Sequence, residues 1–280
     1  MTLTAWCVLI VFASLAGGAA ADRVRLTHRS MQFIMSSVGG LMLGIALLHM
    51  LPHATAQLGS TDEACRAAVA GLLIMFLLLR TFHFHEHEPL DPSHRHGESG
   101  ECDEHPPQPA CHGAHAHSPE TSRHLSWGGV AFGLALHTLM DGMALAAAVQ
   151  AGTDQGAGVL AGLGVFLAIV LHKPLDAVSI TTLMLSGGWS HPARVAVNIA
   201  FALMCPLGAL LFVSGVERFH GMQGTIVGSA LGFSAGVFLC ISMSDLLPEI
   251  EFHTHDRFWL TVCLVTGVVT AALIGFVDAI

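Results

Sequence analysis

Residues 157–185 read AGVLAGLGVFLAIVLHKPLDAVSITTLML, and this stretch decides the fold class. A helix needs about 20 predominantly apolar residues to cross the hydrocarbon core of a bilayer, and this stretch is longer than that. Its only formally charged residues are Lys173 and Asp176, which lie well inside it. Charged side chains at bilayer depth are costly and usually mark a functional site. The stretch therefore predicts a membrane span with a site inside it.

Seven other stretches of the chain have the same apolar character. The complete set is approximately 3–21, 31–53, 64–82, 125–149, 157–185, 193–214, 223–248 and 257–278. The chain of 280 residues is 53% hydrophobic and only 11% charged, whereas soluble domains are about 25% charged. We therefore expect a single transmembrane domain over 1–280, all-α and integral to the membrane, with eight transmembrane helices.

The first stretch has an alternative interpretation. It ends in GGAAA at 17–21, which resembles a signal-peptide cleavage region. No basic residue precedes its apolar run, however, and the count of eight spans gives a consistent topology when it is retained. We interpret it as a true first helix.

Basic residues predict how the chain is oriented. Cytoplasmic loops of membrane proteins are enriched in Lys and Arg. With both termini outside, the cytoplasmic side holds Arg23, Arg25, Arg29, Arg80, Arg95, Arg123, Arg194 and Arg257, and the outer side holds only Arg66 and Arg218. We expect a multi-pass protein of the plasma or inner membrane rather than of an organelle.

Residues 83–124 interrupt the apolar pattern. Their proline content and polarity predict a disordered cytoplasmic loop. The loop is rich in histidine interleaved with carboxylates, a combination that suits borderline divalent ions. We expect metal capture by His83, His85, His87, His94, His96, His112, His115 and His117, with a plain polar spacer as the alternative.

Two pairs of short motifs suggest an internal repeat. HMLPH at 49–53 and DLLPE at 245–249 follow a glycine at the same spacing, and HTLMD at 137–141 pairs with HKPLD at 172–176. The members of each pair run in opposite directions through the membrane, as in transporters that hold their substrate between inverted repeats. We expect a 3+2+3 inverted-repeat arrangement with the metal site on helices 4 and 5. The polar residues at the ends of spans two and seven are candidates for the transport pathway: His49, His53, Asp245 and Glu249.

The fourth and fifth spans each carry histidine and aspartate four residues apart. Side chains at i and i+4 lie on one helix face, so two facing helices would bring together His137, Asp141, His172 and Asp176. Four ionisable groups at mid-span need a compensating partner, and a divalent cation supplies it. Two imidazoles and two carboxylates suit Zn²⁺, with Fe²⁺, Mn²⁺ or Cd²⁺ as alternatives.

Lys173 adds a positive charge beside these carboxylates. We interpret it as a tethered cation that occupies the place of a second metal ion; the alternative is a lysine that snorkels to the membrane interface. Pro174 follows it and removes one helical hydrogen bond, which predicts a kink next to the site.

These motifs resemble those of the ZIP family of zinc and iron-type divalent metal transporters. The resemblance covers nearly the whole chain: eight spans, a histidine-rich loop after the third, and the motifs of spans four, five and seven. It implies an elevator-like carrier that moves metal toward the cytoplasm, commonly as a homodimer. Many members bind two metal ions, but Thr138 and Lys173 stand where the second site would need ligands. Span six offers only Asn198, so the resemblance is to a branch with a mononuclear centre.

Three functions compete at this point. The first is a zinc-preferring divalent cation carrier that needs no cofactor, has Zn²⁺ as its substrate and has metal ions and the lipid bilayer as partners. The second is an intramembrane zinc-dependent hydrolase, which the lack of an HExxH sequence disfavours. The third is a metal sensor that binds without transport. The sequence has no P-loop, and nothing in it suggests a nucleic-acid partner.

Overall fold

The protein is a bundle of membrane-length helices. The computed structural model describes residues 2–21, 28–82, 120–154, 156, 158–219, 221–252 and 257–278. Every regular element in these ranges is helical, and eight helices are long and apolar enough to cross a membrane. The predicted all-α class with eight spans is confirmed.

The elements follow the order of the apolar stretches. They are α1 (Thr2–Ala21), α2 (His28–Ile45), the π-helical turn η1 (Ala46–Met50), α3 (Leu51–Leu58), α4 (Thr61–Phe82), α5 (Glu120–Asp154), the 3₁₀ turn η2 (Gly158–Leu160), α6 (Leu163–Ser186), α7 (His191–Arg218), α8 (Gln223–Phe252) and α9 (Arg257–Asp278). The second span is continuous from α2 through η1 into α3.

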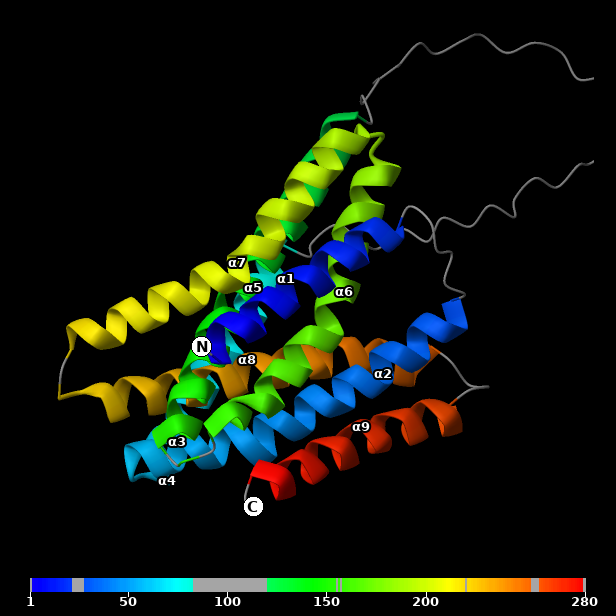
Figure 1. Ribbon diagram of the computed structural model, residues 1–280. Helices are drawn as coiled ribbons and strands as arrows, with labels where there is room; N and C mark the ends of the chain where they lie inside the picture. Colours follow the sequence, from blue (N-terminus) through cyan, green and yellow to red (C-terminus); the bar gives the residue numbers. More distant parts are fainter. Residues whose placement is uncertain are drawn as a thin grey trace, which may run out of the picture.

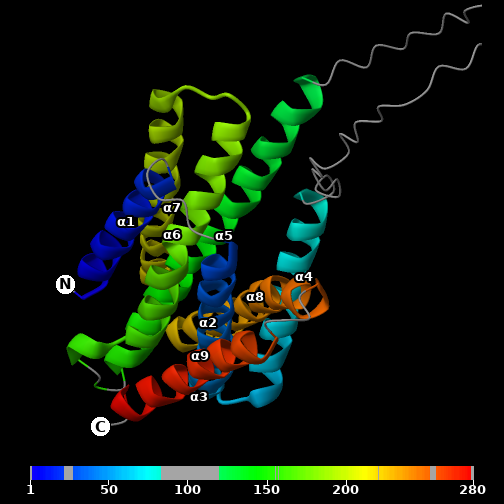
Figure 2. The same ribbon diagram turned by 90° about the vertical axis from the view of Figure 1, so that its right-hand side faces the viewer.

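The helices form two bundles (Figures 1 and 2). In the site bundle, α1 packs against α6 and α7, and α5 packs against α7. In the second bundle, α2 packs against α9, while α8 packs against α3 and α4. The bundles meet where α5 contacts α8 and α6 contacts α2. The fourth and fifth spans, which carry the predicted ligands, thus belong to one bundle.

Glycines hold helices close together within each bundle. A Cβ atom on Gly142 of α5 would overlap the backbone carbonyl of Cys205 on α7, and one on Gly236 of α8 would overlap the carbonyl of Ala68 on α4. The glycines at 224, 228, 232 and 236 line α8 against α3 and α4. This stripe therefore packs inside the second bundle, where small residues permit close backbone approach.

Some boundaries differ from the predicted ones. The fifth span was expected from residue 157, but α6 begins at Leu163, because Gly158–Leu160 forms a 3₁₀ turn and Gly162 has a left-handed φ of 75°. The fourth span was expected from 125, but α5 begins at Glu120, so the last five residues of the expected loop 83–124 are helical. The rest of that loop, 83–119, lies outside the described residues.

Candidate metal centre

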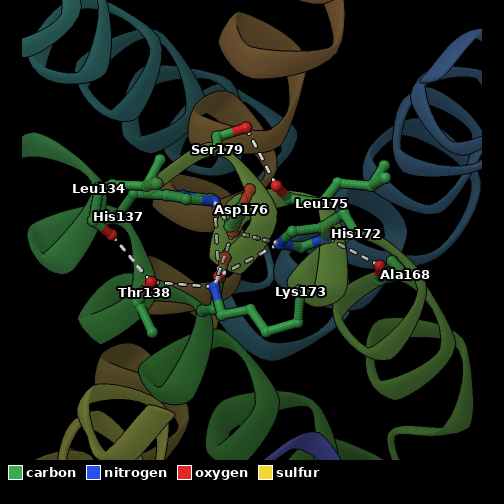
Figure 3. Close-up of polar contacts among 10 residues, drawn as sticks. Leu134, His137, Thr138, Ala168, His172, Lys173, Leu175, Asp176 and Ser179 are labelled. Carbon is green, nitrogen blue, oxygen red and sulfur yellow. Dashed lines mark hydrogen bonds and ion pairs between the residues drawn. The ribbon is translucent and has the colours of Figure 1, made fainter. Parts of the chain in front are cut away.

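The four predicted ligands meet between α5 and α6. One ligand atom from each of His137, Asp141, His172 and Asp176 lies within 4.8 Å of all the others. Each helix contributes a histidine and an aspartate one turn apart, and the two helices face each other across the cluster (Figure 3). The i, i+4 spacing thus converges on one point, as the sequence predicted.

The spacing between ligand atoms is close to that of a tetrahedral site. His172 Nε2 lies 3.3 Å from Asp141 Oδ2, and His137 Nε2 lies 3.5 Å from the same oxygen. Asp176 Oδ2 lies 3.8 Å from His172 Nε2 and 4.0 Å from His137 Nε2. Ligand bonds of about 2.0–2.1 Å around Zn²⁺ place tetrahedral ligands about 3.3 Å apart. The four histidine–carboxylate distances are thus equal to or longer than this value, so the ligands would draw closer together around a bound Zn²⁺ ion.

The cluster is buried except on one side. His137 and Asp141 are 2% and 0% exposed, whereas the Asp176 side chain is 16% exposed. Asp141 Oδ1 and His137 Nδ1 are buried and have no hydrogen-bond partner among the described residues. Buried polar atoms nearly always have a hydrogen-bond partner. Two buried atoms without one are therefore typical of a site that binds a ligand.

A backbone carbonyl fixes the orientation of His172. Its Nδ1–H donates to the carbonyl oxygen of Ala168 at 2.7 Å, one turn earlier on α6. The proton on Nδ1 leaves Nε2 of the neutral ring with a lone pair, and Nε2 faces the carboxylate of Asp141. Metal-binding histidines are held in the same way, by a hydrogen bond from the nitrogen that does not bind the metal.

Lys173 places its ammonium group between the two carboxylates. Nζ donates to Asp141 Oδ2 at 2.6 Å, to Asp176 Oδ2 at 3.2 Å and to the Thr138 hydroxyl at 2.9 Å. The side chain is fully buried, so the alternative that it snorkels to the interface is wrong. The two carboxylates and one ammonium group leave the cluster with a net negative charge when the histidines are neutral.

Lys173 and its neighbour Pro174 each contact another helix. The ring of Phe201 on α7 lies 5.3 Å from Nζ, a cation–π distance. The backbone of Pro174 packs against Gly17 of α1, where a Cβ atom would overlap it. Sequence reasoning missed both partners, because no local pattern connects Phe201 or Gly17 with the fifth span.

Two of the residues predicted for the transport pathway, His49 and His53, lie outside the four-residue cluster. His49 lies in the π-helical turn η1, is buried, and donates from Nε2 to the carbonyl of Ala271 on α9 at 2.7 Å. His53 lies on α3 and is half-buried. Asp245 and Glu249 lie on α8, and their side chains are outside the described part of the protein. The eight loop histidines from His83 to His117 are also outside the described residues.

Comparison with known proteins gives a family match along the chain. A family profile described as "ZIP Zinc transporter" matches residues 2–275. Zinc transporter ZIP9-B of Xenopus laevis is 33% identical over 128 residues, which cover 45% of this chain and 41% of the relative. Zinc transporter ZIP9 of Micropogonias undulatus is 34% identical over 51% of this chain and 47% of the relative. Human zinc transporter ZIP1 is 24% identical over 95% of this chain and 85% of the relative. The chain thus matches less than half the length of these two ZIP9 relatives.

Proposed function

The chain belongs to the ZIP zinc transporter family, whose curated members are transporters rather than enzymes, and from this premise we propose that it carries divalent metal ions, Zn²⁺ in preference, through the cluster between α5 and α6. The observation that carries the proposal is the convergence of His137, Asp141, His172 and Asp176 at one buried point. Two imidazoles and two carboxylates form an N/O ligand set that suits zinc. We expect the ion to bind there as substrate and to leave again, rather than to stay as a structural metal.

The charge of the site supports carriage rather than permanent binding. Two carboxylates in a buried site would hold a dication tightly, and a carrier must release its ion. The ammonium group of Lys173 contacts both carboxylates and opposes the charge of any metal that binds beside it. We propose that Lys173 limits the site to one ion and lowers its affinity for that ion.

The two bundles support an elevator-like movement. All four ligands and Lys173 come from the site bundle, in which Gly142 and Gly17 allow α5 and α1 to touch the backbones of α7 and α6. We propose that the site bundle moves as one body against the second bundle and exposes the cluster first to one side of the membrane and then to the other. His49, which is buried in the second bundle close to Gly164 of α6, is our candidate for a contact along this path, together with His53, Asp245 and Glu249.

Zinc uptake into proteoliposomes tests the proposal. We expect saturable uptake by the wild-type chain and its loss in His137→Ala and Asp176→Asn, with folding checked by thermal unfolding of each variant. Asp62→Asn is the matched control, because it removes an exposed carboxylate in the first turn of α4. Binding of zinc without flux would favour the sensor function instead. Hydrolysis of a substrate in the membrane without flux would favour the hydrolase.

The orientation of the chain is tested separately. The distribution of arginines supports both termini outside. The proposed direction of transport, toward the cytoplasm, is what the family resemblance implies. Cys65 is exposed one turn further along α4, so it is first replaced by serine. A cysteine then introduced as Thr61→Cys, on the exposed first residue of α4, should react with a membrane-impermeant maleimide on intact cells, whereas the Cys65→Ser parent should not gain this label. Labelling of the introduced cysteine only after permeabilisation would reverse the orientation.

The family resemblance also supports a homodimer. We propose that two copies associate in the bilayer and that each carries its own complete site, since all four ligands come from one chain. The mass of the protein in detergent, measured by light scattering at several concentrations, distinguishes a stable dimer from a monomer.

A further inference from the structure

A second polar feature lies away from the metal centre, in a groove between α1, α6 and α7. The groove has a volume of about 810 Å³. Its polar lining includes His191, Arg194 and Asn198, and its apolar lining includes Leu15, Val195 and Ile199. Val195 and Ile199 are 42% and 45% exposed, so the groove opens sideways on the surface that faces the bilayer. None of the four metal ligands lines it.

The length of α7 places the groove at the edge of the membrane. α7 has 28 residues and is about 42 Å long at 1.5 Å per residue, whereas the hydrocarbon core is about 30 Å thick. At least one end of α7 therefore extends beyond the hydrocarbon, and we place its first turn, with the polar residues His191 and Arg194, in the headgroup layer. Asn198 lies one turn deeper, where the hydrocarbon begins.

The groove offers positive charge to a ligand. The Arg194 guanidinium is anchored by a hydrogen bond from Nη1–H to the carbonyl of Trp189 at 2.8 Å, and the N-terminal end of α7 adds the positive end of a helix dipole. No aspartate or glutamate is among the residues that line the groove. The feature therefore suits an anion at headgroup depth, where arginine is the preferred partner of a phosphate.

The environment of Asn198 favours a ligand with a hydrogen-bond donor. The residue is only 8% exposed, and its Oδ1 has no hydrogen-bond partner among the described residues. Its amide packs against Gly18 of α1, where a Cβ atom would overlap it. A glycine thus makes room for a buried polar group that the protein itself does not satisfy. An amide oxygen accepts hydrogen bonds, so a bare phosphate oxygen would not pair with it, but a hydroxyl would.

We propose that this groove binds the headgroup of an anionic phospholipid that carries a hydroxyl, of which phosphatidylglycerol is the simplest. The phosphate pairs with Arg194 and the helix N-terminus, and the headgroup hydroxyl donates to Asn198. The acyl chains leave the groove along Val195 and Ile199 into the bilayer. Basic pockets between transmembrane helices bind anionic lipid headgroups in this way.

Lipid retention by the full-length protein tests this site. We would supply equimolar phosphatidylglycerol and phosphatidylcholine, extract the protein in mild detergent, and count bound lipids by native mass spectrometry. The wild type should retain phosphatidylglycerol in preference. Arg194→Gln and Asn198→Leu should each lower that retention about tenfold, as expected for loss of a hydrogen bond at a charged or buried group. Val195→Trp should block the groove without changing its charge.

The controls separate this site from nonspecific attraction. Arg257→Gln removes an exposed arginine at the start of α9, on the same predicted side of the membrane, and should leave retention unchanged. Equal retention of both lipids by the wild type, or an equal loss in Arg257→Gln, would overturn the proposal. Displacement of the lipid by excess inorganic phosphate would also overturn it, because the groove would then bind free phosphate. If Arg194→Gln does not fold, full retention by Val195→Trp is the result that refutes the site.

Discussion

Replacing Lys173 by methionine removes the fixed positive charge that contacts both carboxylates of the cluster. In the wild type, Nζ lies 2.6 Å from Asp141 and 3.2 Å from Asp176, and the lysine side chain is fully buried. Removal of one partner from a buried ion pair typically destabilises a protein by about 3–5 kcal/mol, because the other charge is left uncompensated. We expect the metal-free variant to lose stability in this range.

A bound zinc ion should recover much of that loss. The ion replaces the missing positive charge, so the free energy lost by the metal-free variant reappears as tighter binding. A full recovery would tighten the Kd by between about 10² and 4 × 10³-fold, since each 1.4 kcal/mol is a factor of ten. If a carboxyl group of the metal-free variant takes up a proton, zinc must displace that proton, and the gain in zinc affinity is smaller. We therefore expect zinc to bind at least about tenfold more tightly, with slower uptake because release becomes slower.

The assay needs three measurements on each variant. Competition with a fluorescent chelator gives the Kd, elemental analysis gives the number of bound ions, and thermal unfolding with and without chelator gives the stability. Arg218→Gln is the control for net charge, because it removes one exposed cation at the far end of α7. If the Kd, the stoichiometry and the stability of Lys173→Met all match those of Arg218→Gln, Lys173 does not control the metal site.

Three further predictions concern other parts of the molecule. Gly236→Ala should lower the free energy of unfolding by about 1–3 kcal/mol, because the new methyl group meets the backbone of Ala68. Gly215 has open space around it, so Gly215→Ala should be neutral or slightly stabilising in the same thermal assay. His49→Phe should destabilise the protein by about 0.5–1.5 kcal/mol, because the hydrogen bond from its imidazole to the carbonyl of Ala271 is lost. The zinc Kd should stay unchanged, and a large change in Kd would place His49 at the metal centre. Zinc at 100 times its Kd should stabilise the wild type by about 2.7 kcal/mol, and His137→Ala should abolish this shift; a shift that persists in the variant would locate the zinc elsewhere.

The sequence predicted the spans and the pairing of the four candidate ligands because both depend on local patterns. Span length follows from a run of apolar residues, and the i, i+4 spacing puts His137 with Asp141, and His172 with Asp176, on common helix faces. The convergence of the two pairs needed only one further assumption, that the fourth and fifth spans face each other.

Other features depend on contacts that no local pattern specifies. The contact of Phe201 with Lys173 arises because α7 packs beside α6, and the carbonyl that holds His49 belongs to Ala271, far along the chain. The start of α6 was misplaced because the apolar residues before Leu163 resemble a span, while the left-handed backbone of Gly162 ends that pattern. The inverted repeat stays a prediction.

Positions in this chain should differ in how well they tolerate mutation. Glycines make the closest contacts inside each bundle, whereas larger apolar residues make the contacts between the bundles. Gly142 and Gly236 touch backbone atoms of a neighbouring helix, so almost no replacement fits there. Ile45 of α2, Ile169 of α6 and Phe238 of α8 share one buried apolar cluster, where residues of similar volume can be exchanged at small cost. If the site bundle moves against the second bundle as proposed, variants with altered transport rate should therefore be found mainly in the second group of positions. Libraries built to tune turnover should leave the glycines alone and vary the apolar residues between the bundles.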